Sequence, residues 1–173
     1  MSGRGRAVVG VAGSPAALAA LVRAVEEARR SDVELVVVRA VTSLGAPLPV
    51  DAAEPTTIRV LRHGAAAVIE RAFTTTGGAP YDVEVSRETP VGAPGLALVS
   101  IADRPDDLLI VGQDRHRALH RALHGSVSSY CASHAVCRVL VVPPPGTPEP
   151  VADGLTPDHG SRTLRALRRQ LST

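Results

Sequence analysis

The sequence predicts an α/β layered domain in which helices cover both faces of a parallel β-sheet. Short apolar runs that do not alternate with polar residues, such as Leu35-Val36-Val37-Val38, are typical of strands buried on both sides. Along the chain, these runs alternate with segments whose apolar residues recur at helical spacing. In a domain of this class the ligand site is expected beyond the carboxyl ends of the strands, where the strand order reverses.

The first half of the chain predicts two strands and two helices. The apolar run from Ala7 to Ala12 is the first strand, and Gly13-Ser14-Pro15 then supplies a turn, a helix N-cap and a proline at the first helical position. Val33 to Val41 is the second strand, followed by a loop over residues 43–55. A second helix begins at Thr56 or Thr57 and ends at Gly77-Gly78. The apolar faces of these helices are Leu18, Leu21, Val22, Val25 and Ala28 in the first, and Ile58, Leu61, Ala65, Val68, Ile69 and Ala72 in the second.

The second half continues the same alternation. Tyr81 to Arg87 alternates apolar with charged residues, which predicts an edge strand exposed on one side. The elements predicted after it are a helix from Ala93 to Asp103, a strand from Leu108 to Val111, a helix from Gly125 to Ala135 and a strand from Arg138 to Val142. Residues 6–143 therefore form the predicted domain. Residues 144–173 are a Pro- and Gly-rich linker with a short helix over 161–171, which either frays or docks on its own domain, a partner or an anionic surface.

Composition excludes several classes of function. The chain has 173 residues and 45% hydrophobic content, enough to fill one core. Trp is absent and the aromatic residues are Phe73, Tyr81 and Tyr130, which argues against single-stranded nucleic acid because such binding relies on stacking. A net charge of +2 is too small to indicate duplex binding. The sequence contains no lysine, which excludes a Walker phosphate loop.

The cysteines and the N-terminus indicate the compartment. Cys131 and Cys137 are too few for a disulfide framework, and their spacing fits neither a redox pair nor a zinc knuckle. The first apolar run is too short for a signal-peptide core or a membrane span. We therefore expect a soluble, cytoplasmic protein with no membrane partner.

The segment from Asp107 to Val142 carries the strongest indication of a ligand. A buried strand ends at Gly112, a basic loop follows, and Gly125-Ser126 opens a helix with small, polar first residues. Unpaired N–H groups and the positive end of the helix dipole attract anions at such a helix start. We therefore expect Gly112 and Gly125 to converge on a phosphate cradle at the rim of the sheet.

In the order and spacing of these segments, the chain resembles the universal stress protein family over about residues 6–143. The resemblance implies an open five-stranded parallel sheet in the order 3-2-1-4-5, Rossmann-like and adenine nucleotide alpha hydrolase-like. It also implies a homodimer formed through the strand Arg138 to Val142, and ATP bound at the switch point. The segments that carry the resemblance are Val8 to Pro15, Glu34 to Val38, Asp107 to Gly112, Gly125 to Ser128, and Cys131, His134 and Cys137 leading into Val139 to Pro143.

The family's nucleotide pattern is Gly, two residues, Gly, nine residues, Gly, and Ser or Thr. Gly112, Gly125 and Ser126 match it, whereas Arg115 replaces the second glycine and either obstructs the phosphates or contacts them. Ala12 stands where similar nucleotide-binding members carry Asp, a loss worth about 1 to 3 kcal/mol of recognition. The nucleotide-binding residues that the resemblance implies are Val11, Ala12, Val41, Gly112, Gln113, Arg115, Gly125, Ser126 and Val127. Val11 and Val41 would wall the adenine, and Ser126 would donate its hydroxyl to a phosphate.

Three functions follow as hypotheses. The first is a stress-response dimeric module that binds an adenine nucleotide, ATP or ADP, with slow hydrolysis at most. The second is the same fold with a vestigial pocket, acting as a protein-interaction module through its C-terminal tail. The third, an adenylate-transferring enzyme, lacks catalytic residues: the sequence contains no nucleophile elbow and no His-Glu-x-x-His motif.

Other polar residues receive structural interpretations. His116, His120 and His124 recur every four residues; a solvated basic loop over the pocket is favoured over a metal site because the outer two would lie about 12 Å apart on a helix. Cys131 shares one helical face with Val127, Tyr130 and His134, which predicts core packing. The carboxylates Asp103, Asp106 and Asp107 beside Pro105 are expected to cap a turn and to be solvated.

Overall fold

A five-stranded parallel sheet forms the centre of the protein, with the strand order β3-β2-β1-β4-β5 that the resemblance implied. The computed structural model describes residues 5–42, 56–113 and 126–146. The strands are β1 (Ala7–Gly10), β2 (Leu35–Val38), β3 (Val85–Glu88), β4 (Leu108–Gly112) and β5 (Arg138–Val142). The central strand β1 pairs with β2 through Ala7 and Leu35, and with β4 through Ala7 and Leu108.

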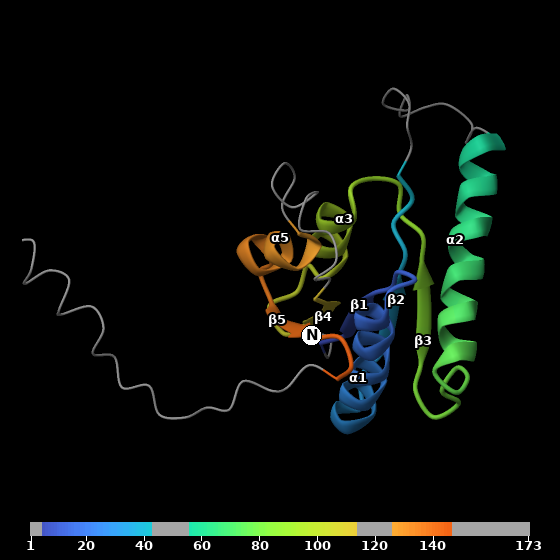
Figure 1. The fold of residues 1–173 in the computed structure, drawn as a ribbon. Helices are drawn as coiled ribbons and strands as arrows, with labels where there is room; N and C mark the ends of the chain where they lie inside the picture. The colour runs from blue at the N-terminus through green and yellow to red at the C-terminus, as the bar shows by residue number, and fades with distance from the viewer. Residues whose placement is uncertain (1–4, 43–55, 114–125, 147–173) are drawn as a thin grey trace, which may run out of the picture.

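Helices cover both faces of this sheet, as predicted from the non-alternating strands. The described helices are α1 (Pro15–Ser31), α2 (Thr56–Thr75), α3 (Pro94–Ile101) and α5 (Val127–His134). One core cluster joins the sheet to α1 and α2 through Leu21, Ile69 and Phe73. A second cluster joins the opposite face to α3 and α5 through Leu98 and Cys131. Figure 1 shows α3 and α5 side by side, apart from α1 and α2.

The strands follow the hydrophobic pattern but are shorter than the apolar runs. All four residues of β2 are buried, which confirms that a run without alternation is covered on both faces. The strand β3 lies at one edge, with Arg87 and Glu88 exposed, as the alternating pattern predicted. Val41, at the end of the predicted second strand, instead forms an isolated parallel bridge with Val91.

The buried faces of the helices are narrower than the apolar faces predicted from the sequence. On α1, Leu21 is fully buried, whereas Val22 is 43% exposed and does not belong to the buried face. On α5, Cys131 is fully buried, as expected, but its neighbours Val127 and Tyr130 are 40% and 37% exposed. The Tyr130 ring stacks on His134 at 4.1 Å between centroids, so these side chains cover one another at the surface.

Asp107, expected to be solvated, is fully buried, so that prediction is wrong. Its carboxylate accepts hydrogen bonds from the Arg6 backbone N–H at 2.8 Å, from Arg6 Nε at 3.2 Å and Nη2 at 2.7 Å, and from the Arg104 N–H at 3.3 Å. Arg6 Nη2 also contacts Asp103, which is exposed as expected. Burial acts to raise the pKa of Asp107, but the hydrogen bonds from Arg6 and Arg104 outweigh it and hold the pKa below its ordinary value. This ion pair ties the start of β1 to the turn before β4.

Candidate functional site

The carboxyl ends of β1 and β4 lie against the first turn of α1. Gly112 ends β4, and a Cβ atom added there would lie 2.6 to 2.7 Å from backbone atoms of Ala16 and Ala17. Only glycine therefore allows this approach. Ser14 caps α1, accepting a hydrogen bond from the Ala17 N–H at 3.2 Å, and Pro15 opens the helix. The sequence analysis predicted that Gly112 helps to form a phosphate cradle. The structure shows in addition that a side chain at this position would clash with the backbone of α1.

The residues that follow β1 differ in accessibility. Val11 is 4% exposed, and its N–H donates to the Val38 carbonyl at 2.9 Å, which extends the β1–β2 ladder. Ala12 is half-buried. The space around Gly13 is open, since a Cβ atom added there would meet nothing within 4 Å. The chain between β1 and α1 is therefore covered at Val11 and open two residues later, at Gly13.

Val41, the second residue predicted to wall an adenine, is also buried, at 5% exposure. Its N–H donates to the Pro90 carbonyl at 2.8 Å, and its carbonyl accepts from the Gly92 N–H at 2.9 Å. These bonds fasten the chain after β2 to the chain after β3. Gln113 is similarly engaged, because its N–H donates to the Val142 carbonyl at 2.7 Å and continues the β4–β5 pairing.

Ser126 caps α5 and belongs to a cluster of serine hydroxyls. Its Oγ accepts from the Ser129 N–H at 3.1 Å and lies 2.7 Å from Ser129 Oγ and 3.0 Å from Ser128 Oγ. Ser126 is half-buried, and Val127 beside it is exposed. No acidic residue occupies the first turn of either α1 or α5. Both helix starts therefore retain the positive potential of their dipoles.

The remaining predicted residues, Arg115 and Gly125, lie outside the described residues. The same holds for His116, His120 and His124, and for the C-terminal segment beyond residue 146. Whether Gly112 and Gly125 converge therefore stays a prediction.

Arg39 is a residue of this edge that the sequence analysis missed. It follows β2 directly, is half-buried, and its Nη1 donates to the Val11 carbonyl at 3.3 Å. The signal that would have found it is a lone basic residue at the carboxyl end of a buried apolar strand. Arg39 places a cation beside the predicted ligand edge.

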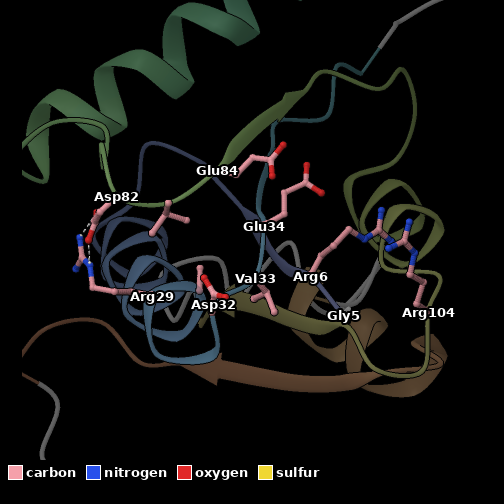
Figure 2. Close-up of a pocket in the computed structure, with 11 residues that line it drawn as sticks. Gly5, Arg6, Arg29, Asp32, Val33, Glu34, Asp82, Glu84 and Arg104 are labelled. Atoms are coloured by element: carbon pink, nitrogen blue, oxygen red, sulfur yellow. Dashed lines mark hydrogen bonds and ion pairs between the residues drawn. The ribbon is translucent and has the colours of Figure 1, made fainter. Parts of the chain in front are cut away.

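Two cavities among the described residues lie elsewhere, at the amino ends of the strands. One, of about 340 Å³, is lined mainly by charged side chains of both signs. Figure 2 shows Arg29 paired with Asp82 at one end, Arg6 and Arg104 at the other, and Glu34 and Glu84 between them. The second cavity, of about 470 Å³, includes Arg23, Arg30 and Arg138. Neither coincides with the predicted nucleotide edge.

The described residues contain no group of His, Cys, Asp or Glu side chains arranged to hold a metal ion. None of the helices in this part of the chain combines the length and hydropathy needed to cross a membrane.

The strand order, the covered faces and the position of the helix starts define a Rossmann-like domain of the adenine nucleotide alpha hydrolase-like class. The chain belongs to the universal stress protein family, whose model matches residues 3–143.

Solved structures are similar to this chain over most of its length. A universal stress protein in complex with cAMP is 28% identical, with a TM-score of 0.56 over 82% of this chain and 98% of that one. The universal stress protein UspA from Lactobacillus plantarum is 24% identical, with a TM-score of 0.55 over 80% and 99% of the two chains. A universal stress protein from Archaeoglobus fulgidus is 22% identical, with a TM-score of 0.51 over 80% and 98%. A sequence search of curated proteins finds no match.

Proposed function

We propose that this protein is a stress-response module that binds an adenine nucleotide at the carboxyl ends of β1 and β4. The observation that carries the proposal is the close approach at Gly112, which brings the ends of both strands to the start of α1. The starts of α1 and α5 offer the hydroxyls of their serine caps, and neither first turn carries an acid that would repel phosphate. The similar protein in complex with cAMP supports an adenine nucleotide as the ligand class.

The competing proposal is an interaction module without a nucleotide. It is favoured by Ala12, which offers no carboxylate to the adenosine, and by the burial of Val11 and Val41. In either case we propose slow hydrolysis at most, because no catalytic constellation occurs among the described residues of this edge.

A homodimer through β5 is part of the proposal. The strand β5 is one edge of the sheet and exposes apolar surface. Val141, in this strand, is 37% exposed, and Val136, which precedes the strand, is 64% exposed. The opposite edge strand β3 instead presents the charges of Arg87 and Glu88, which protect an edge from pairing. The edge at β5, where four apolar residues follow Arg138, is therefore the one that would accept a second copy.

The nucleotide proposal is tested on the purified full chain. The protein is denatured, released nucleotides are identified, and ATP, ADP, AMP and cAMP are then titrated by calorimetry. We expect at least one adenine nucleotide to be released or to bind with a measurable Kd. If none of the four is retained and none binds, the nucleotide proposal is wrong and the interaction module remains.

Two serine variants of α5 locate the binding. Ser126→Asp keeps a good helix cap but places a negative charge at the expected phosphate position, so affinity should fall about tenfold or more. Ser133→Asp adds the same charge to an exposed position of the same helix and should leave affinity unchanged. Equal effects of the two variants would contradict the proposed place of the phosphate.

A further inference from the structure

The cavity of about 470 Å³ lies between α1 and β5, on the face of the sheet that α1 covers. Because β1 and β2 are parallel, α1 runs from the carboxyl ends of the strands back to their amino ends. The α1 residues that line the cavity belong to the second half of the helix, and its β5 residues begin with Arg138, the first of that strand. The cavity therefore lies at the amino ends of the strands, opposite the proposed nucleotide edge.

The strands contribute an apolar side to this cavity. Ala7, Leu108 and Leu140 line it and also pack in the core cluster between the sheet and α1. The strand register pairs Ala7 with Leu108, and Leu108 with Arg138. Alternate residues of a strand face the same side, so Arg138 and Leu140 both face α1. The apolar side therefore ends at a guanidinium group on β5.

The helix contributes two cations and one acid to the lining. The Oε1 atom of Glu27 accepts hydrogen bonds from Arg23 at 2.7 Å and from Arg30 at 2.8 Å, so one carboxylate serves two guanidinium groups. The Glu27 side chain is 13% exposed, whereas those of Arg23 and Arg30 are 44% and 60% exposed. Glu26 is also near Arg23, at 3.7 Å, but it does not line the cavity and is 54% exposed. The covered carboxylate thus orients two guanidinium groups that reach the solvent-filled space.

An anion in this cavity is favoured between Arg23 and Arg138. The helix α1 ends at Ser31, where its dipole is negative, and Arg30 in the last turn offsets that dipole. Arg23 lies eight residues before Ser31, about 12 Å along the helix, beyond the reach of the negative end. Asp106, the lining acid at the amino end of β4, is exposed, so water and salt screen its charge.

We propose that this cavity is a second binding site, which takes a small amphipathic anion: a carboxylate or phosphate group attached to an apolar chain. The anionic group lies between Arg23 and Arg138, and the apolar chain covers Leu108 and Leu140. A planar guanidinium offers paired N–H groups to two oxygens of either head group. A volume of about 470 Å³ is in the range of small-molecule sites. The site does not depend on the proposed nucleotide binding, because it uses the opposite ends of the strands.

Four probes separate the head group from the apolar chain. Octanoate has both, acetate has the carboxylate alone, and 1-octanol has the chain without the charge; octyl phosphate exchanges the head group. In calorimetric titrations of the full chain, octanoate or octyl phosphate should bind about tenfold or more tightly than acetate and 1-octanol, and the tighter of the two identifies the head group. Equal affinity for acetate would overturn the role of the apolar side. Equal affinity for 1-octanol would overturn the role of the arginines, and failure of both amphipathic probes to bind would end the inference.

Variants of Arg138 locate the binding. Arg138→Gln removes the cation on β5, so affinity for the better amphipathic probe should fall about tenfold or more. Arg138→Lys keeps the charge without the planar fork and should retain part of the affinity. Arg71 is exposed on α2 and does not line the cavity, so the control Arg71→Gln changes the net charge equally and should bind like the wild type. Full affinity in Arg138→Gln, or an equal loss in Arg71→Gln, would overturn the inference.

Competition with a nucleotide distinguishes this site from the proposed one. An excess of AMP should leave the affinity for the amphipathic probe unchanged, because the two ligands use opposite ends of the strands. Displacement by AMP would place the probe at the carboxyl edge and overturn this inference. If the amphipathic probe binds and no adenine nucleotide does, the proposed function fails and the second site stands.

Discussion

Replacing Asp107 by Asn should lower the free energy of unfolding much more than replacing the nearby, exposed Asp103 by Asn. The Asp107 carboxylate is fully buried and accepts four N–H groups, three of them from Arg6. An Asn side chain keeps one acceptor oxygen and turns an NH₂ group toward these donors. It also leaves the Arg6 guanidinium, whose side chain is 15% exposed, without its main countercharge. Breaking such a buried pair costs about 3 to 5 kcal/mol, and we expect the lower end because Asp103 still contacts Arg6.

Asp103→Asn is the matched control. Its carboxylate contacts the same Arg6 Nη2 at the same distance of 2.7 Å, but its side chain is 66% exposed. Water competes for such a contact, so the free energy of unfolding should fall by less than about 1 kcal/mol. Both variants are measured by urea denaturation at neutral pH. Losses of equal size would refute the argument that burial sets the strength of this ion pair.

The same pair predicts a dependence on pH. The pKa of Asp107 in the folded protein lies below the ordinary value of 3.8, so its stabilising contribution is complete above that value and is lost as the pH falls through the folded pKa. The difference in unfolding free energy between the wild type and Asp107→Asn should therefore shrink when the pH is lowered from about 6 to about 3. A difference that stays constant over this range would contradict the assigned direction of the pKa shift.

Three further predictions concern the strand ends and the cysteines. Gly112→Ala should lower the free energy of unfolding by about 1 to 3 kcal/mol and weaken nucleotide binding, because its Cβ would lie 2.6 Å from the α1 backbone. Gly13→Ala, with nothing within 4 Å, should be neutral or stabilising in the same denaturation assay; equal losses would contradict the packing argument. Val141→Lys should shift the mass measured by light scattering from dimer to monomer, and a mass that stays dimeric would place the interface elsewhere. Burial raises the pKa of Cys131 to about 11 and also raises that of Cys137, so a thiol reagent at pH 8 should modify the half-buried Cys137 first and Cys131 only on unfolding. Modification in the reverse order would contradict the burial of Cys131.

The sequence predicted best what depends on short stretches of chain. The run Leu35-Val36-Val37-Val38 predicts a strand that is covered on both faces, because apolar residues point to both sides of it. The helix starts could be predicted from Ser14 with Pro15 at α1 and from Ser126 at α5, because capping involves residues only a few positions apart. Strand order depended on the family resemblance, since local patterns do not say which strands become neighbours.

The sequence could not predict contacts between distant segments. Asp107 appeared to be one of three turn carboxylates because its partner, Arg6, lies 101 residues away. The packing role of Gly112 is invisible without the position of α1, and Arg39 acquires its meaning only where two strands part. Tyr130 and Val127 share a face with Cys131, but helical periodicity does not say how wide a buried stripe will be.

The central position of the first strand has a consequence for synthesis on the ribosome. A nascent chain that has released β1, β2 and β3 can pair them, but the other side of β1 keeps an open apolar edge until β4 emerges. Only then can Asp107 form its ion pair with Arg6 and β1 gain its second neighbouring strand. We therefore expect the nascent chain to aggregate most readily between the synthesis of β3 and that of β4, and less readily once Asp107 and β4 have joined β1.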